Sequence, residues 1–292
     1  MSGLRIYVPG DAAAVAVGAD DVAAAIAIAA KRSGTPVDIV RNGSRGLHWL
    51  EPMVEVATAQ GRIAYGPVTA SDAAAIFKAA ANSGEHRLRL GKSEDIPFLK
   101  NQTRLTFARC GIVDPRSLAD YCAHAGYKGL AGALKMPAGA VVEEVTQSGL
   151  RGRGGAGFPT GVKWKTVADT ASDQKYIVCN ADEGDSGTFA DRMIMEGDPF
   201  VLIEGMTIAG IAVGATQGYI YVRSEYPHAI AVLVDAIAAA RKGGMLGAGV
   251  AGSSHAFDLE VRAGAGAYVC GEETALLDSL EGKRGEVRAK PP

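Results

Sequence analysis

The strongest constraint on the fold is a regular alternation of strand and helix patterns toward the C-terminal end. Strand-like runs cover residues 175–179, 218–222 and 257–262, and helix-like runs cover 198–213, 227–241 and 271–280. Parallel strands need long crossover connections, and helices of this length supply them. The alternation therefore predicts a mostly parallel sheet with helices on its faces, in an α/β fold of the Rossmann-like kind.

The N-terminal stretch predicts a second, smaller α/β unit. Its pattern reads strand, helix, strand, a hairpin of two strands, and helix, at residues 4–8, 20–32, 36–40, 53–58, 61–65 and 69–81. This βαβ–ββα order is that of a thioredoxin-like domain. The four cysteines (Cys110, Cys122, Cys179 and Cys270) form no C-x-x-C pair. Redox catalysis by that route is excluded, which leaves a docking or scaffolding role.

Composition and charge bound the class of protein. The 292 residues are 48% apolar with a net charge of −2, which excludes a disordered chain and gives no support to a nucleic-acid binder. We expect no membrane insertion and no secretory signal, and the cysteine spacing favours a cytoplasmic protein.

The polar stretch 83–104 marks the boundary between the two predicted domains. We predict a thioredoxin-like domain at 1–84, a linker at 85–110 and a ligand-binding domain at 111–292.

The first candidate binding loop spans residues 149–164. It holds six glycines in thirteen residues, together with Arg151, Arg153 and Lys163. Bare backbone amides beside cations suit a phosphate or pyrophosphate. Residues 152–157 match G-x-G-x-x-G, but a helix pattern precedes them where the dinucleotide fingerprint needs a strand, so we reject that motif. The alternative is a flexible glycine loop without a ligand.

The second and third loops follow strands of the predicted sheet, where open α/β sheets bind ligands. Asn180 and three acids (Asp182, Glu183 and Asp185) follow the first strand, and suit ribose, ribityl hydroxyls or a metal. A carboxylate facing a 2′-hydroxyl favours NAD over NADP. Residues 264–274 offer the flat ring of Tyr268 and two acids at a helix start. The alternatives are a solvated acidic turn and ordinary helix-start acids. Together the loops predict a site for a flavin phosphate and a second nucleotide.

These motifs resemble a known family. Residues 148–163, 179–187 and 264–274 are similar to signature segments of the NADH-binding flavoprotein subunit of respiratory complex I, the 51 kDa type. The likeness runs from about Phe98 to Pro292. The thioredoxin-like front part, with residues 42–46 and 49–52, resembles the beta (flavoprotein) subunit of soluble molybdenum-dependent NAD formate dehydrogenases. Diaphorase subunits of NAD-reducing hydrogenases are close relatives.

The resemblance implies FMN and NAD(H) stacked in one cavity. By motif position, the FMN-binding residues would be Gly152, Gly154, Lys163, Asn180, Asp182, Tyr268, Gly271 and Glu272. The NAD-binding residues would be Gly155, Phe158, Glu183, Asp185 and Glu273. Hydride would pass directly between the two cofactors without a catalytic side chain, with Glu183 and Asp185 nearest to tune it. The family commonly carries Glu at the position of Asp185, so the shorter acid has a shorter reach.

The resemblance also implies partners. FMN would exchange single electrons with iron–sulfur clusters, alongside a small [2Fe-2S] thioredoxin-like subunit and a molybdenum-containing formate-oxidising subunit. Family members continue past Pro292 into a ubiquitin-like SLBB domain and a [4Fe-4S] domain whose cysteine ligands this sequence lacks, so we expect no metal ligands here. Either the sequence is part of a longer subunit, which we favour, or it lacks its own electron outlet. A hydrogenase or complex I subunit, a non-catalytic assembly subunit with a relic flavin site, and a general polyanion binder are the alternatives.

Overall fold

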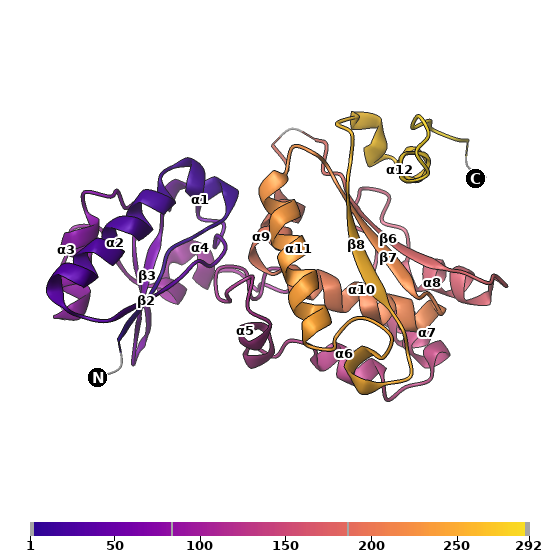
Figure 1. The fold of residues 1–292 in the computed structure, drawn as a ribbon, viewed down its shortest axis with the longest axis horizontal. Coiled ribbons are helices and arrows are strands. Elements are labelled where there is room, and N and C mark those ends of the chain that lie inside the picture. Colours follow the sequence, from indigo (N-terminus) through magenta and orange to yellow (C-terminus); the bar gives the residue numbers. More distant parts are fainter. Residues whose placement is uncertain (1–2, 83, 186, 290–292) are drawn as a thin grey trace. The chain divides into compact units, whose positions relative to one another are not determined.

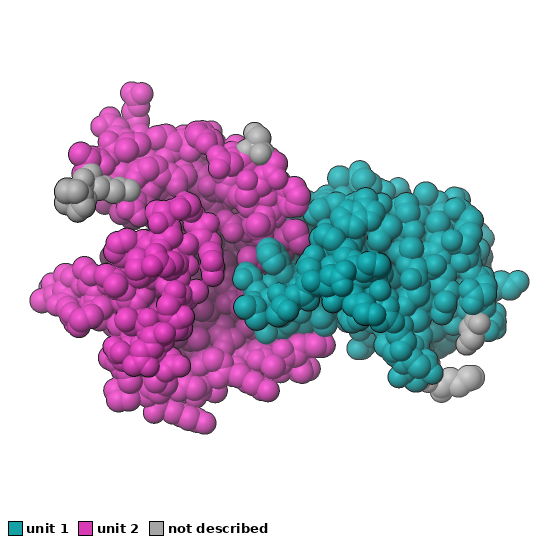
Figure 2. Space-filling model, turned by 180° about the vertical axis from the view of Figure 1, so that it is seen from behind, with its two compact units in different colours: residues 1–115, 196–198 teal, residues 116–195, 199–292 magenta. Residues whose placement is uncertain are grey.

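The computed structural model describes residues 3–82, 84–185 and 187–289 and separates into two compact units (Figures 1 and 2). Unit 1 comprises Met1–Pro115 and Glu196–Asp198, and unit 2 comprises Arg116–Met195 and Pro199–Pro292. Among the described residues, no helix combines the length and hydrophobicity needed to cross a membrane. Each unit has its own buried apolar cluster.

Unit 1 is built on a five-stranded sheet in the order β2-β1-β3-β4-β5, with β1 and β2 parallel and the other pairs antiparallel. Its strands are β1 (Leu4–Tyr7), β2 (Val37–Val40), β3 (Val54–Thr58), β4 (Gly61–Tyr65) and β5 (Arg89–Lys92). Its helices are α1 (Ala12–Ala16), α2 (Ala19–Ser33), α3 (Ala73–Ala81) and α4 (Pro97–Lys100), with 3-10 turns η1 (His48–Leu50) and η2 (Ser93–Asp95). Helices α2 and α3 bury Ile26 and Ile76 with Ile6 in one core. The order of β1, α2, β2, β3, β4 and α3 confirms the predicted thioredoxin-like arrangement.

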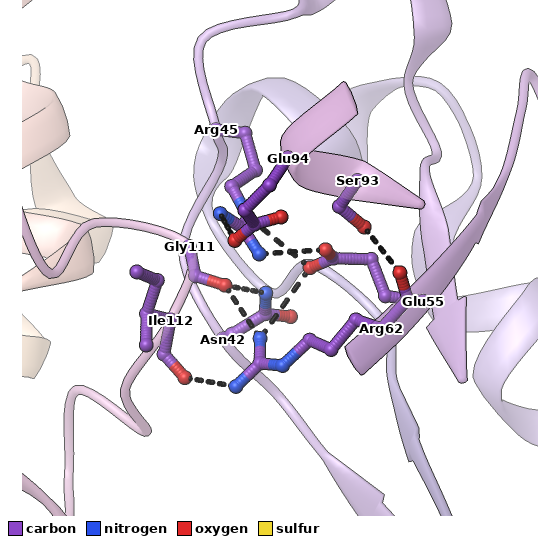
Figure 3. A network of polar contacts seen from close by, with 8 residues as sticks. All are labelled: Asn42, Arg45, Glu55, Arg62, Ser93, Glu94, Gly111 and Ile112. Atoms are coloured by element: carbon purple, nitrogen blue, oxygen red, sulfur yellow. Dashed lines mark hydrogen bonds and ion pairs between the residues drawn. The ribbon is translucent and has the colours of Figure 1, made fainter. Parts of the chain in front are cut away.

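The stretch 85–110 differs from the linker that its charges suggest. It contains β5, η2 and α4, and it groups with unit 1. The reason is a buried polar network, drawn in Figure 3. Arg45 lies 2.7 Å from the Glu55 carboxylate and 3.0 Å from that of Glu94. Arg62 donates to the carbonyls of Gly111 and Ile112 at 2.9 and 2.6 Å.

The network pairs charged residues that lie far apart along the chain, such as Glu94 and Arg45, so local composition cannot reveal these pairs. Asn42 adds a further link, because its amide nitrogen donates to the Gly111 carbonyl at 2.7 Å. The side chains of Arg45 and Glu55 are only 5% and 1% exposed. Buried charges of this kind persist only when each is paired and hydrogen-bonded. The network fixes residues 94 and 111–112 against the sheet of unit 1.

Unit 2 is built on a parallel sheet in the order β6-β7-β8, which confirms the parallel pairing predicted from strand–helix alternation. Its strands are β6 (Tyr176–Ala181), β7 (Gln217–Val222) and β8 (Asp258–Ala263). Its helices are α5 (Leu118–Ala123), α6 (Lys128–Ala133), α7 (Ala138–Gln147), α8 (Thr160–Asp169), α9 (Ala190–Gly197), α10 (Pro199–Val213), α11 (Pro227–Lys242) and α12 (Glu273–Leu280), with 3-10 turns η3 (Val250–Gly252) and η4 (Tyr268–Gly271). The last residues of α9 group with unit 1.

The core of unit 2 lies mainly on one face of this sheet. Helix α10 buries almost its whole length, including Phe200 and Ile203, and it packs with α11 against Ile220 of β7. Helix α12 packs on the opposite face, where Leu276 contacts Tyr221. Adjacent strand residues point to opposite faces, so Ile220 and Tyr221 face the two helix layers. This arrangement brings the start of α12 to the carboxyl ends of the strands (Figure 1).

Candidate cofactor-binding site

The glycine-rich loop between α7 and α8 folds as a short hairpin. The Gly152 amide donates to the Phe158 carbonyl at 2.9 Å, and the Thr160 amide donates to the Leu150 carbonyl at 2.9 Å. Gly155 and Gly157, at the tip, have φ angles of +101° and +62°, a region that side chains with a Cβ rarely adopt. As predicted, a helix and not a strand precedes this loop.

Helix α8 begins at Thr160, within a stretch that the sequence pattern predicts wholly as a loop. Its first turn carries Gly161, which packs so closely on α7 that a Cβ would lie 2.3 Å from the Thr146 hydroxyl. The first turn also carries Lys163, whose ammonium lies 3.9 Å from the Glu273 carboxylate and whose side chain is 61% exposed. A helix N-terminus beside a lysine is a favourable environment for an anion such as phosphate.

The end of strand β6 supplies the centre of the site. The Asn180 side-chain amide donates to the Gly271 carbonyl at 2.9 Å, and its oxygen accepts from the Asp182 amide at 3.2 Å. The first contact joins the loop after β6 to the turn before α12. The two loops therefore meet at Asn180, as expected for the carboxyl ends of parallel strands.

The loop after β8 contributes a ring and a capped helix. The Tyr268 hydroxyl donates to Asp185 at 2.7 Å, which makes a second link between this loop and the loop after β6. Glu272 is the N-cap of α12, and its carboxylate accepts from the amides of Thr274 and Ala275 at 2.9 and 3.0 Å. An acid at this position is stabilised by the helix amides.

The three loops enclose two adjoining hollows. The first, which we call the glycine lobe, has a volume of 690 Å³ and is lined by Gly152, Gly154, Ala156, Gly157, Phe158, Thr160, Lys163, Val178, Asn180, Gly271, Glu272, Glu273, Thr274, Leu276 and Leu277. The second, the acidic lobe, has a volume of 910 Å³ and is lined by Arg153, Gly154, Gly155, Asn180, Asp182, Glu183, Gly184, Asp185, Thr188, Asp191, Tyr268, Val269, Gly271 and Glu272. Both volumes are in the range of small-molecule and cofactor sites. Gly154, Asn180, Gly271 and Glu272 line both lobes.

Every residue predicted to bind FMN or NAD lines at least one lobe. The division between the lobes differs in part from the predicted division between the cofactors. Phe158 and Glu273, predicted on the NAD side, line the glycine lobe, whereas Asp182 and Tyr268, predicted to hold FMN, line the acidic lobe. The roles of these residues stay predictions, while their convergence is a structural fact.

Several lining residues are not among those expected from the sequence. Thr188 lies just before α9 and Asp191 lies in its first turn, and the sequence pattern does not predict this helix. Val178 and Leu276 add apolar surface to the glycine lobe. Val178 was detectable, because it shares a strand face with Asn180 two positions later.

The acidic lobe is lined by five carboxylates and one arginine. Three of the carboxylates accept hydrogen bonds from donors: Glu183 from the start of α9, Asp185 from Tyr268, and Glu272 from α12. Burial raises the pKa of Asp182, against the opposing effect of Arg223, and burial together with Glu183 raises the pKa of Asp191. Such a lobe suits hydroxyl groups better than a second dense anion.

The residues of the glycine lobe fit the parts of FMN. The glycine lobe offers open backbone, since a Cβ on Gly154 or Gly157 would meet no heavy atom within 4 Å. Lys163 and the first turn of α8 suit a phosphate. Asn180 carries both a donor and an acceptor, which suits the polar edge of a flavin ring. The apolar surfaces of Val178 and Leu276 suit the ring itself.

Comparison with curated proteins finds relatives that align to about two thirds of the chain. The chain is 55% identical over 193 residues to the NADP-reducing hydrogenase subunit HndC of Solidesulfovibrio fructosivorans, covering 66% of this chain and 39% of that protein. It is 48% identical over 199 residues to an NADH-quinone oxidoreductase subunit of Aquifex aeolicus, covering 68% and 46%. The chain thus spans less than half the length of these relatives.

Comparison with solved structures finds an NAD+-reducing [NiFe]-hydrogenase, in its air-oxidized state, with a TM-score of 0.51 and 25% identity. That match covers 100% of this chain and 48% of the other, so it includes both units. A family description, the Nuo51 FMN-binding domain, matches residues 145–292, which contain all three loops of the site. The FMN expected from the sequence is the cofactor in that description. The chain belongs to the Nuo51 FMN-binding domain family, the family of the 51 kDa-type flavoprotein subunit of complex I.

Proposed function

We propose that the chain is the FMN- and NAD(H)-binding part of a flavoprotein subunit in a multi-subunit, NAD-linked oxidoreductase. The observation that carries this proposal is the double hollow at the carboxyl end of β6, with open glycine backbone and Lys163 in one lobe and hydrogen-bonded carboxylates in the other. The names of the relatives, an NADP-reducing hydrogenase subunit and NADH-quinone oxidoreductase subunits, support a nicotinamide dinucleotide as the second ligand.

In this proposal Gly152, Gly154 and Lys163 hold the FMN phosphate, and Asn180 and Gly271 hold the flavin ring. Glu183, Asp185 and the backbone of Gly155 form the dinucleotide side. Bound FMN supplies the chemistry of accepting a hydride and releasing single electrons. The protein residues orient the two ligands, and no side chain needs to donate or abstract a proton.

Within this class, we propose the diaphorase subunit of an NAD-dependent formate dehydrogenase, on the resemblance of the N-terminal part. A diaphorase subunit of an NAD-reducing hydrogenase is the second candidate, and the solved hydrogenase that matches the whole chain favours it. The iron–sulfur partners, the molybdenum-containing partner and the cytoplasmic location belong to the same proposal.

Two experiments test these levels separately. The purified chain should bind added FMN and quench the fluorescence of the flavin. The FMN-loaded chain should reduce ferricyanide with NADH. A chain that binds no FMN contradicts the proposal that it is part of a flavoprotein subunit. The complex isolated from the native source should then reduce NAD⁺ with formate as the electron donor. Hydrogen-dependent activity without formate-dependent activity contradicts the formate dehydrogenase assignment and leaves the flavoprotein assignment intact.

A further inference from the structure

Glu183 lines the acidic lobe, but its carboxylate is held from the side of helix α9. One oxygen accepts from the Asp191 amide at 3.0 Å, and the other accepts from the Arg192 amide at 3.2 Å. These are two of the first amides of α9, which otherwise have no partner within the helix. Glu183 is only 8% exposed, so this carboxylate is enclosed by protein.

Two residues that follow strand β7 complete the enclosure. The Tyr226 hydroxyl donates to the second Glu183 oxygen at 3.1 Å. The Arg223 guanidinium donates to the Glu183 backbone carbonyl. The carboxylate and the adjoining peptide are therefore both held by the segment 223–226, which lines neither lobe.

The Tyr226 ring is itself fixed by cations. The guanidinium carbons of Arg223 and Arg192 lie 5.1 and 5.5 Å from the ring centroid. Arg192 also lies 5.6 Å from the ring of Phe189. Cation–π contacts at these distances orient the ring and bring positive charge close to Glu183.

We infer that Tyr226 and Arg223 are positioning residues for the dinucleotide, acting through Glu183. This inference rests on the proposed function, because it takes the acidic lobe as the dinucleotide side. The physical reason is electrostatic. Asp182 and Asp185 already line this lobe, and a Glu183 carboxylate released from its contacts would turn one more unbalanced negative charge toward the lobe, which disfavours an anionic dinucleotide.

Phenylalanine at position 226 retains the ring and removes the hydroxyl, together with its contacts to Glu183 at 3.1 Å and to the Thr188 carbonyl at 3.4 Å. Using the FMN-loaded chain, we expect the Kd for NADH, measured by calorimetry, to rise about tenfold, in line with the loss of one hydrogen bond to a charged group. The Kd for FMN, measured by flavin fluorescence, should change less than twofold, because Tyr226 does not line the glycine lobe. Tyr219→Phe is the matched control, since Tyr219 lies on β7 and stacks on Tyr176.

A double-mutant cycle separates positioning from a general structural effect. If Tyr226 acts only through Glu183, then Tyr226→Phe combined with Glu183→Gln should bind NADH no more weakly than Glu183→Gln alone. Additive losses would overturn the inference, as would an unchanged Kd for NADH in Tyr226→Phe, or equal losses of NADH and FMN. Arg223→Lys, which keeps the charge with a different donor geometry, should weaken NADH binding in the same selective way. A wild-type chain that binds FMN but no NADH would instead refute the proposed function.

Discussion

A glycine of unit 1 and two glycines of unit 2 serve opposite purposes. In unit 1, a Cβ on Gly43 would lie 2.5 Å from the Cα of Gly197, so glycine there is required by close backbone packing. In unit 2, a Cβ on Gly154 or Gly155 would meet no heavy atom within 4 Å. The same residue type therefore marks tight packing at Gly43 and open backbone beside a hollow at Gly154 and Gly155. Glycine content alone does not identify a ligand site, whereas open space around a glycine that also lines a hollow supports one.

Charged residues show the same contrast. In unit 1, Arg45 and Glu55 are enclosed and pair with each other. In unit 2, Lys163 and Glu273 flank the glycine lobe with 61% and 57% of their side chains exposed, and their charges are 3.9 Å apart. A buried ion pair stabilises the fold and cannot be broken without a large loss of stability. An exposed ion pair beside a hollow contributes little to stability, so its charges can bind a ligand instead of each other.

The largest effect should come from breaking the enclosed pair. Among the described residues, Glu55→Ala leaves the buried Arg45 with only the exposed Glu94 as a carboxylate partner, and unit 1 should lose about 3–5 kcal/mol of unfolding free energy. The measurement is urea unfolding followed by the fluorescence of Trp49, in a Trp164→Phe background where unit 1 carries the only tryptophan. Glu94→Ala is the control and should cost less than about 1 kcal/mol. Similar losses from both variants would contradict the distinction between enclosed and exposed charges.

A second buried acid of unit 1 makes its stability depend on pH. Burial raises the pKa of Glu51 to about 7, and the neighbouring Asp11 adds to the increase, although Ser44 and the Met53 amide donate to this carboxylate at 2.7 and 2.8 Å. The folded state therefore holds a proton that the unfolded state releases above its ordinary pKa of 4.5.

The resulting stability is fully present below pH 4.5 and is lost as pH rises to about 7, by about 3 kcal/mol in total. The Trp49 unfolding experiment, repeated between pH 4 and pH 8, measures it. Glu51→Gln cannot titrate, so the difference between wild type and this variant isolates Glu51. If both lose stability equally with rising pH, the effect belongs to other groups.

Most of the fold was predictable, because its signals are local. Strand-like patterns in the sequence identify every described strand except β5, and the connection lengths require the parallel sheet of unit 2. The convergence of the loops also followed from the sequence, because parallel strands place their carboxyl ends at one edge. Asn180 and the loop after β8 meet there for this reason.

The missed features depend on contacts between distant residues. The charges of 83–104 favour a linker because local sequence does not show their partners: Arg45, the partner of Glu94, lies 49 positions away. Helix α8 was hidden because Gly161, a poor helix former, is required by its contact with Thr146. The sequence also does not show which residues line which lobe. Phe158 lines the glycine lobe because the loop folds as a hairpin that pairs Gly152 with Phe158.

Gly161 and Gly154 of unit 2 differ in the space around them, so alanine substitutions at these two positions compare tight packing with open backbone. Gly161→Ala would place a Cβ 2.3 Å from the Thr146 hydroxyl and 2.5 Å from its Cα, and it should cost unit 2 about 2 kcal/mol. Trp164, in a Trp49→Phe background, reports this unfolding. Gly154→Ala has room for its methyl group and should change stability by less than about 0.5 kcal/mol. It should nevertheless weaken FMN binding, because Gly154 lines both lobes. The reverse pattern would contradict the use of surrounding space to identify ligand glycines.

The smallest effect tests whether an exposed charge serves a ligand. Lys163 and Lys165 lie on the same helix with 61% and 69% of their side chains exposed, but only Lys163 lines a lobe, while Lys165 pairs with Asp169 at 3.0 Å. Lys163→Ala should weaken FMN binding about tenfold, since one exposed charge-assisted contact to phosphate is lost and the amides of α8 remain. Lys165→Ala should leave FMN binding unchanged.

Riboflavin, which lacks the phosphate, sharpens this test. Its affinity should be the same in wild type and Lys163→Ala, so the preference for FMN over riboflavin should narrow by the same factor of about ten. Fluorescence titration with both flavins measures that preference directly. Equal loss of FMN and riboflavin would mean that Lys163 supports the shape of the lobe and not the phosphate. In that case the exposed charges of unit 2 would serve the fold as the enclosed charges of unit 1 do.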